Sequence, residues 1–320
     1  MGCAVDLKTG VPRNLVCVCD KKSLLQVSTS GLICESGVCF HSNELRAFPI
    51  IEGVPVVISE ELCDTVCEVG EVKSPVLRST KGAGVLGKII SPNPRVTIAN
   101  CEKFVREVNL LSSNPRVLIV GSGTKGRGTE SLWADNQINR VGIDIYFSET
   151  VDVICDAHYL PFGDKTFHGV WVQAVLEHVV EPSVVVAEID RVLVDRGLVY
   201  AETPFMQQVH EGAYDFTRFT VLGHRYLFRQ FQAIDFGGNK GAEVVLAWAV
   251  RYFIWSVVRS RFFARVSGVL AGFLLRPFAS LTSQKSLFDS SSGVFFLGRK
   301  GIEEPPLTHK QLVSLYRGQF

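Results

Sequence analysis

The chain has 320 residues, enough for about two domains. Its 33 Lys and Arg residues nearly balance its 32 Asp and Glu residues, so the net charge of +1 offers no basic field for nucleic acid, and no nucleic-acid partner is expected. Hydrophobic residues make up 47% and charged residues 20%, which excludes a disordered or collagen-like chain.

The first 70 residues differ from the rest of the chain in cysteine content, since they hold seven of the nine cysteines. Short β-like runs broken by turns fill the same stretch, so we interpret residues 1–70 as a small β-rich module. An odd and sparse set of cysteines does not suit a disulfide scaffold. The first residues lack the basic start and apolar core of a signal peptide, so reduced thiols and a cytoplasmic location are expected.

A linker is predicted next, over residues 71–112, because Gly, Ser, Pro and Lys are frequent in its first part. From Asn114-Pro115 onward, apolar strands alternate with helical stretches, which is typical of βαβ units on a parallel sheet. The predicted strands cover residues 116–120, 141–144, 151–155, 169–172, 197–201, 231–236 and 293–297. We therefore predict an α/β fold with a doubly wound, mostly parallel sheet of seven strands, formed by residues 113–240 and 291–300.

The last two predicted strands are separated by a long segment, residues 241–290, which we predict to be a helical insertion. Residues 244–280 hold five arginines and no acidic residue, with aromatic side chains among them. Arg251 in the middle of the most apolar run argues against a membrane-spanning helix. Two interpretations are left: a helix lying at a membrane surface, or a buried cap over the ligand site or at a homodimer contact. The second is preferred because apolar helices usually belong to a core. Residues 301–320 are expected to form a tail.

A glycine-rich turn, Gly121-Ser122-Gly123-Thr124-Lys125-Gly126, directly follows the first predicted strand of the sheet. Glycine is needed where the backbone turns tightly and comes close to a ligand. Asp144 ends the next strand about 20 residues later, where a carboxylate can accept both ribose hydroxyls of an adenosine. The turn and the carboxylate together predict a cofactor that contains a nucleoside, and the G-x-G-x-x-G spacing alone does not exclude NAD.

Three further segments distinguish between the cofactors. They are Asp156-Ala157-His158-Tyr159-Leu160-Pro161-Phe162, Phe167-His168-Gly169-Val170-Trp171 and Val175-Leu176-Glu177-His178-Val179. With the glycine-rich turn they resemble, from about Arg116 to Phe236, the small-molecule branch of the class I S-adenosylmethionine-dependent methyltransferases. The resemblance implies a Rossmann-like fold, S-adenosylmethionine as cofactor, and methyl transfer to a small-molecule acceptor. The segment Tyr214-Asp215-Phe216-Thr217-Arg218-Phe219-Thr220 resembles one found in methyltransferases that are encoded with sugar and cell-envelope biosynthesis, which implies a carbohydrate or lipid-linked acceptor.

The resemblance also implies which residues bind the cofactor. Gly121 and Gly123 would pass under its methionine part, Asp144 would bind the ribose, and Asp156 would hydrogen-bond the adenine amino group. The complete set that it implies is Gly121, Ser122, Gly123, Asp144, Asp156, Ala157 and Gln173.

The sequence departs from the family pattern at two positions. Ile119 stands two places before the first glycine, where the family often has an acidic residue, and His168 replaces the usual aspartate before the fourth strand. These departures keep a second interpretation open, namely a non-catalytic scaffold or regulatory binding protein with the same fold.

The acceptor is expected beside the loop that follows the fifth predicted strand, because the carboxyl ends of parallel strands border the ligand crevice. In this loop His210 can serve as a general base near neutral pH, and Asp215 is a second catalytic candidate. Tyr214 and Arg218 are candidates for binding a polar acceptor. The alternative is that His210 and the Asp215/Arg218 pair only stabilise the loop. His178 is expected to be structural.

The N-terminal module resembles a small zinc-ribbon-like module that is sometimes fused ahead of methyltransferases. The resemblance rests on Cys17-x-Cys19, Cys34-x4-Cys39 and the run Phe48-Pro49-Ile50-Ile51-Glu52-Gly53-Val54-Pro55. Four thiolates can close a zinc site, but zinc ribbons usually take two C-x2-C knuckles. A metal-free module that serves as a partner or substrate platform is therefore preferred over a zinc site.

Overall fold

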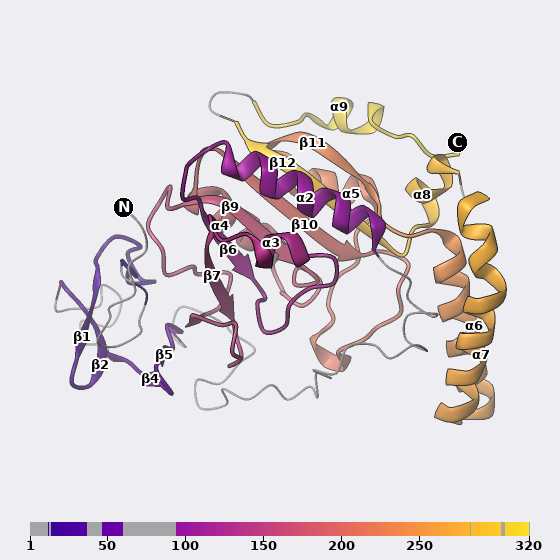
Figure 1. Cartoon of the computed structure of the whole chain (residues 1–320), viewed down its shortest axis with the longest axis horizontal. Helices are drawn as coiled ribbons and strands as arrows, with labels where there is room; N and C mark the ends of the chain where they lie inside the picture. Colours follow the sequence, from indigo (N-terminus) through magenta and orange to yellow (C-terminus); the bar gives the residue numbers. More distant parts are fainter. Residues whose placement is uncertain are drawn as a thin grey trace.

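The computed structural model describes residue 12 and residues 14–36, 47–59, 94–281, 283–301 and 305–319. The described residues form a seven-stranded sheet with the order β11-β12-β10-β9-β6-β7-β8 (Figure 1). Only β12 among these strands runs antiparallel to its neighbours, β10 and β11. The strands are β6 (Arg116–Val120), β7 (Asn139–Asp144), β8 (Val153–Ile154), β9 (Phe167–Gln173), β10 (Leu193–Pro204), β11 (Phe231–Gly238) and β12 (Gly293–Lys300). The predicted α/β fold with a mostly parallel sheet is thus confirmed.

Helices cover both faces of the sheet, because successive strand residues point to opposite faces and both sets are apolar. On one face, Phe104 packs edge to face on Trp171, with ring centroids 5.4 Å apart. On the other face, Val185 and Ile189 join Val170 in the core. The covering helices are α2 (Arg95–Asn109) and α3 (Glu130–Ala134) on the first face, and α4 (Pro182–Val192) and α5 (Val221–Leu227) on the second. Among the described residues, these helices leave the strand ends accessible to a ligand.

The helix α2 lies within the segment predicted as a linker, so that prediction is wrong for residues 95–109. Cys101, Phe104, Val105 and Val108 recur at spacings of three and four residues, which places them on one face of a helix. All four side chains are buried against the sheet. The prediction followed the Gly, Ser and Pro content of the preceding residues and missed this periodicity. Residues 71–93 of the predicted linker lie outside the described residues.

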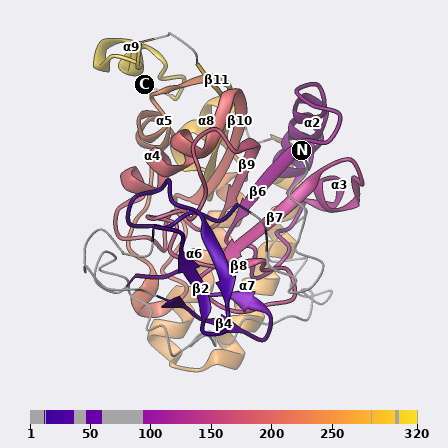
Figure 2. The same ribbon diagram turned by 90° about the vertical axis from the view of Figure 1, so that its left-hand side faces the viewer.

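The N-terminal module forms a three-stranded sheet and a separate two-stranded hairpin. Its strands are β1 (Leu25–Ser28), β2 (Gly31–Cys34), β3 (Ala47–Phe48), β4 (Ile50–Ile51) and β5 (Val54–Pro55). The module packs beside β8, where the backbone N–H of Val57 donates to the carbonyl of Ile154 at 2.8 Å (Figure 2). A salt bridge of 2.6 Å between Lys21 and Glu188 on α4 joins the module to the helix layer.

Three of the four cysteines predicted as zinc ligands belong to the described residues. Cys17 and Cys34 are buried in the core that the module shares with the sheet, and Cys19 is half-buried. Cys39 lies outside the described residues. The zinc-ribbon-like character of the module and its ligand set therefore stay predictions.

The segment between β11 and β12 is helical, as predicted. It contains α6 (Ala242–Val258), α7 (Arg261–Leu275), the 3-10 turn η2 (Arg276–Leu281) and α8 (Gln284–Ser290), and α9 (His309–Ser314) follows β12. The helices α6 and α7 lie side by side at the edge of the molecule (Figure 1). Phe253, Phe262 and Phe273 on these helices are 65%, 69% and 64% exposed. A cap buried within the chain therefore does not describe these side chains; the homodimer contact, the other form of the preferred interpretation, stays a prediction.

Candidate functional site

The carboxyl ends of neighbouring parallel strands meet at one edge of the sheet and border a cavity of about 1240 Å³. Ligands bind at this edge in open parallel sheets, since the loops after adjacent strands part there. The volume exceeds the roughly 300–1,000 Å³ of most ligand pockets, so a cofactor and an acceptor can fit together. The lining contains most of the residues predicted to bind ligands, namely Gly121, Gly123, Asp144, Asp156, Ala157, Gln173 and His210.

The loop after β6 forms one wall of the cavity. Gly121 has a φ of +75°, which favours glycine, and a Cβ atom there would lie 2.2 Å from Cγ2 of Val175. The backbone N–H of Gly123 donates to Oδ2 of Asp144 at 2.8 Å. Oδ1 of Asp144 accepts from the backbone N–H of Tyr146 at 3.2 Å. These bonds fix the loop and the carboxylate relative to each other.

Asp156, shortly after β8, and Gln173, the last residue of β9, continue the wall. Oδ1 of Asp156 accepts from the backbone N–H of His158 at 2.9 Å and lies 2.5 Å from its Nδ1. Nε2 of Gln173 donates to the carbonyl of Arg127 at 3.2 Å, which ties the end of β9 to the loop after β6. Polar groups in fixed positions thus surround this half of the cavity.

Ser122 is a predicted cofactor-binding residue that the structure does not bring to the cavity. Its side chain is buried, and its hydroxyl donates to the carbonyl of Thr150 at 2.9 Å. The hydroxyl of Thr150 in turn donates to the carbonyl of Ser122. We therefore correct its expected role from cofactor contact to support of the loop.

The other half of the cavity is lined by residues at the end of β10 and in the segments that follow β10 and β11. They are Glu202, Gln207, His210, Glu211, Lys240 and Trp248. The carboxylate of Glu202 accepts from the hydroxyls of Thr97 and Tyr200, each at 2.7 Å. Burial lowers the pKa of the Lys240 ammonium. Sequence reasoning missed Lys240 and Trp248, because only the folded chain brings the start of the insertion to the strand ends.

His210 and Asp215, the predicted catalytic pair, lie together on the loop between β10 and α5. Nδ1 of His210 is 3.2 Å from Oδ2 of Asp215, and the same oxygen accepts from the backbone N–H of His210 at 2.8 Å. Although burial acts to raise it, hydrogen bonds from Arg218 and from the backbone of His210 lower the pKa of Asp215 to about 2. Burial lowers the pKa of His210. Asp215 is thus an ionised group beside a neutral imidazole, to whose Nδ1 it makes no hydrogen bond in this geometry.

Arg218 and Tyr214 do not line the cavity. The guanidinium of Arg218 donates two hydrogen bonds to Asp215 and further ones to the carbonyls of Gln207 and Gln208. Tyr214 ends the short 3-10 turn η1 (Gly212–Tyr214), and its carbonyl accepts from Nδ1 of His178 at 2.6 Å. Both residues therefore support the loop that carries His210, which is the alternative that the sequence left open for Arg218, and we do not place them at the acceptor.

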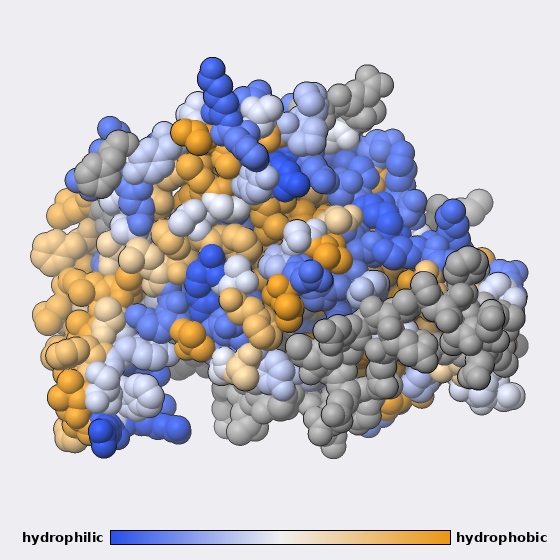
Figure 3. Space-filling view, turned by 180° about the vertical axis from the view of Figure 1, so that it is seen from behind, coloured by the Kyte–Doolittle hydropathy of each residue, from blue (hydrophilic) through white to orange (hydrophobic). Residues whose placement is uncertain are grey.

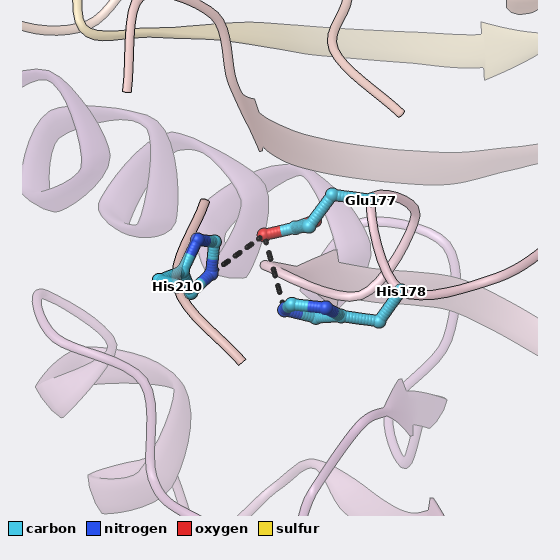
Figure 4. A group of neighbouring side chains, drawn as sticks. All are labelled: Glu177, His178 and His210. Atoms are coloured by element: carbon cyan, nitrogen blue, oxygen red, sulfur yellow. Dashed lines mark ion pairs between the residues drawn. The ribbon is translucent and has the colours of Figure 1, made fainter. Parts of the chain in front are cut away.

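Glu177 and His178, in the loop after β9, meet His210 at the polar end of the cavity (Figure 4). Oε1 of Glu177 lies 3.7 Å from Nε2 of His178 and 3.8 Å from Nε2 of His210. The Glu177 side chain is 1% exposed, and burial raises its pKa to about 8. Sequence reasoning gave Glu177 no role and took His178 as structural. The sequence feature that could have indicated this site is the adjacent pair Glu177-His178 shortly after the end of β9.

Comparison with known proteins identifies part of the chain. A family model described as a methyltransferase domain matches residues 118–201, which run from β6 into β10. No curated protein matches the sequence. Residues 118–201 include the glycine-rich loop, Asp144, Asp156 and Gln173, so the part of the chain that matches the methyltransferase domain also forms this wall of the cavity.

Several solved structures are similar to this chain. One is phosphoethanolamine N-methyltransferase 2 from Haemonchus contortus in complex with S-adenosyl-L-methionine, at 15% identity over 64% of this chain and 53% of that chain, with a TM-score of 0.40. Another is coclaurine N-methyltransferase bound to N-methylheliamine and SAH, at 12% identity over 64% and 71% of the two chains, with a TM-score of 0.40. The [4+2]-cyclase SpnF matches at 20% identity over 66% and 81%, with a TM-score of 0.37. At such scores these likenesses identify no acceptor.

The residues at the first half of the cavity fit S-adenosylmethionine. The carboxylates of Asp144 and Asp156 can accept hydrogen bonds from hydroxyl and amino groups, which the cofactor carries on its nucleoside. The backbone of Gly121 and Gly123 permits close approach of a ligand. When bound, the cofactor supplies a methyl group that is already activated on a sulfonium.

Proposed function

We propose that the protein transfers a methyl group from S-adenosylmethionine to a lipid-linked or amphiphilic small-molecule acceptor, which it takes up at a membrane surface. The helix pair α6–α7 carries this proposal. Its apolar side chains face solvent, and Trp248 on α6 lines the acceptor half of the cavity. An acceptor anchored in lipid could therefore present its polar part to the cavity without leaving the surface.

The contact between α6 and α7 supports the assignment to lipid. The buried residues of α7 are Ala264, Gly268 and Gly272, one on each turn. A Cβ atom on Gly268 would lie 3.0 Å from Cβ of Arg251 on α6, so the two backbones approach closely. Helix pairs in water bury their large apolar side chains, whereas helices in lipid pack through small residues and leave the large ones outside. This pair follows the second pattern.

The exposed face of the pair combines aromatic and cationic side chains. Figure 3 shows the apolar surface gathered at the side of the molecule where α6 and α7 lie. The cationic residues are Arg251, Arg259, Arg261, Arg265 and Arg276, with no acidic residue between 244 and 280. Each arginine near an anionic lipid surface contributes about 1 kcal/mol to binding. This composition supports binding at the interface of an anionic membrane.

Within the described residues, the stretch Arg261–Leu281 is also long and apolar enough to cross a membrane, by length and composition alone. We favour the interface because Arg265 and Arg276 lie inside this stretch, and arginine at bilayer depth is unfavourable. The remaining alternative for the apolar face is a homodimer contact. We accordingly expect a cytoplasmic protein that binds the membrane peripherally.

The acceptor half of the cavity supports an acceptor with a polar and an apolar part. Glu202, His210 and Lys240 supply polar groups, and Trp248 supplies an apolar surface. Since the methyl group is already activated, catalysis depends mainly on alignment, and orientation can supply about 7–11 kcal/mol of the lowering of the barrier. Asp215 beside Nδ1 of His210 leaves Nε2 with a lone pair that can accept a proton from the acceptor.

Vesicle flotation combined with methyl transfer tests the proposal. The full-length protein is mixed with methyl-labelled S-adenosylmethionine and vesicles made from a polar-lipid extract that contains anionic lipid. We expect the protein to float with these vesicles, less so at 1 M salt, and label to enter the organic-soluble fraction. The double variant Phe253→Ser/Phe262→Ser should lose flotation and labelling at least tenfold and keep its affinity for S-adenosylhomocysteine. The control Val313→Ser removes another apolar side chain, 69% exposed on α9, and should keep both.

The possible results separate the alternatives. Label only in water-soluble glycans, or flotation that the double variant retains, would contradict uptake at the membrane. Flotation that resists both salt and alkaline extraction would favour a spanning helix. If the wild-type protein does not bind vesicles and sediments as a dimer, and the double variant sediments as a monomer, the apolar face is a contact with a second copy of the chain. Binding of S-adenosylhomocysteine without label in any fraction would favour the non-catalytic scaffold.

A further inference from the structure

Three side chains from two loops converge at the acceptor end of the cavity. Glu177 and His178 follow β9 and His210 follows β10, and one ligand atom from each lies within 4.8 Å of the others (Figure 4). The two oxygen–nitrogen separations at Oε1 of Glu177 are 3.7 and 3.8 Å. Ligand atoms bonded to zinc at about 2.0–2.1 Å in a tetrahedral site lie about 3.3 Å apart. Small side-chain rotations would therefore bring the three groups to coordination distance.

The carboxyl group of Glu177 is buried, and its oxygens can still accept a ligand bond. Neither of its oxygens has a hydrogen-bond partner among the residues that the structure describes, and the side chain is 1% exposed. A buried carboxyl group whose oxygens lack partners is unfavourable, and such groups are usually paired, protonated or bound to a metal. The neighbouring guanidinium of Arg218 makes its hydrogen bonds to Asp215 and to backbone carbonyls of the loop.

The two imidazoles are held with their Nε2 atoms toward this carboxylate. Nδ1 of His178 is 2.6 Å from the carbonyl of Tyr214, and because a carbonyl only accepts, Nδ1 carries the hydrogen. Nδ1 of His210 lies 3.2 Å from the carboxylate of Asp215 but makes no hydrogen bond to it in this geometry; the negative charge of that carboxylate favours a hydrogen on Nδ1. Both Nε2 atoms therefore have a free lone pair in the neutral form. Metal-binding histidines usually have such a carbonyl or carboxylate behind the second nitrogen.

From these three observations we propose that Glu177, His178 and His210 bind a divalent first-row transition-metal ion of the Zn²⁺ class. Two imidazoles and one carboxylate suit such ions better than Mg²⁺ or Ca²⁺, which prefer oxygen ligands. Glu211 is a further group at the site, with Oε2 3.9 Å from Nε2 of His178. His178, His210 and Glu211 line the cavity, so the ion keeps a coordination position open to it. Three protein ligands with an open position are typical of catalytic zinc sites.

What the ion would act on rests on the proposed function. An ion at this place would face the acceptor and polarise an oxygen atom of its polar part, which makes that oxygen easier to deprotonate. Binding uses the lone pair of His210 Nε2, so His210 is then a ligand and not the general base. The two roles of His210 exclude each other, and a metal-binding measurement separates them.

Titration of the full-length, chelator-treated protein with Co²⁺ and with Zn²⁺ tests the proposal. We expect one ion for this site and Co²⁺ absorption bands without thiolate charge transfer, which distinguishes it from a cysteine site in the N-terminal module. Glu177→Gln, which keeps the size of the side chain, and His210→Gln should each weaken Zn²⁺ binding about 100-fold or more. Asp215→Asn should weaken it about 10- to 100-fold, since it removes the group behind a ligand. His309→Gln, outside the cavity, is the matched control and should change nothing.

Calorimetry with S-adenosylhomocysteine verifies that each variant is folded. The proposal is overturned if the wild-type protein binds no Co²⁺ or Zn²⁺, if its Co²⁺ spectrum shows only thiolate ligands, or if folded Glu177→Gln or His210→Gln binds zinc like the wild type. Should one of these two variants fail to fold, the other and the wild-type spectrum decide. Because the metal is added without an acceptor, a failure of the proposed membrane acceptor leaves this result unaffected.

Discussion

Asp144 provides the most direct test of the cofactor site. Its carboxylate ends β7 and lines the cavity, where it accepts from the backbone N–H groups of Gly123 and Tyr146. If its oxygens also accept from two ribose hydroxyls, each of those bonds involves a charged acceptor and contributes about 1.5–3 kcal/mol. Asp144→Asn keeps the shape of the side chain, removes its negative charge and costs about one of the two hydrogen bonds to the ribose. We expect the Kd for S-adenosylhomocysteine to rise about 10- to 150-fold.

Isothermal calorimetry measures this change in Kd. A second variant of Asp144, a control variant at Asp152 and thermal unfolding separate loss of binding from loss of loop stability. Asp144→Ala removes both bonds and should abolish detectable binding. Asp152→Asn alters a carboxylate outside the cavity lining that accepts from the backbone N–H of Gly142 at 2.7 Å, and it should leave the Kd unchanged. Thermal unfolding without ligand shows whether loss of the bond to Gly123 disrupts the loop. A folded Asp144→Asn variant whose Kd stays within twofold of the wild type would refute the assignment.

Other predictions concern the loop, the core and the acceptor end. Gly121→Ala should lower the free energy of unfolding in urea by about 1–3 kcal/mol, because alanine is strained at positive φ. The comparison variant is Gly212→Ala: Gly212 has a φ of +63° and open space around it, so this variant measures the backbone strain without the contact to Val175 that a Cβ on Gly121 would make. His224 is fully buried between aromatic rings, and burial lowers its pKa to about 3. As the pH drops below 6.5, the ordinary pKa of histidine, the unfolded chain therefore binds a proton at His224 and the folded chain does not. The free energy of unfolding then decreases as the pH decreases. From pH 7 to pH 5 the wild type should lose about 2 kcal/mol more than His224→Leu. Trp248→Ala should raise the KM for the acceptor about tenfold or more through lost apolar contact and leave the Kd for S-adenosylhomocysteine unchanged.

The strands and the cofactor half of the site could be predicted from the sequence, for a common reason. A strand buried on both faces is a continuous apolar run, and β6 is found over Arg116–Val120, the residues predicted for it. Since the carboxyl ends of parallel strands meet at one edge, finding the strands also placed Gly121 and Asp144 together. The bounds were less accurate for β10, which extends from Leu193 to Pro204 beyond the predicted residues 197–201.

The rest of the site depends on contacts between segments that are far apart in the chain. Glu177 lies in a short motif next to His178, but its meeting with His210 depends on how the loops after β9 and β10 fold toward each other. The same holds for Arg218, whose charge suggested a contact with the acceptor. In the structure its donors are used by Asp215 and by backbone carbonyls. Residue type indicates what a side chain can bind, and the surrounding loop determines which partner it meets.

The position of the insertion follows from the direction of β12. This strand begins at Gly293, opposite Pro204 at the end of β10, and it also pairs with the end of β11, where Gly238 lies opposite Val294. Both ends of any segment inserted between β11 and β12 therefore lie at the carboxyl edge of the sheet, beside the cavity. A parallel seventh strand would have required the chain to cross to the opposite edge before entering it. The antiparallel strand thus places α6 and α7 next to the half of the cavity that holds Trp248, and the topology of the sheet relates the proposed membrane contact to the proposed chemistry.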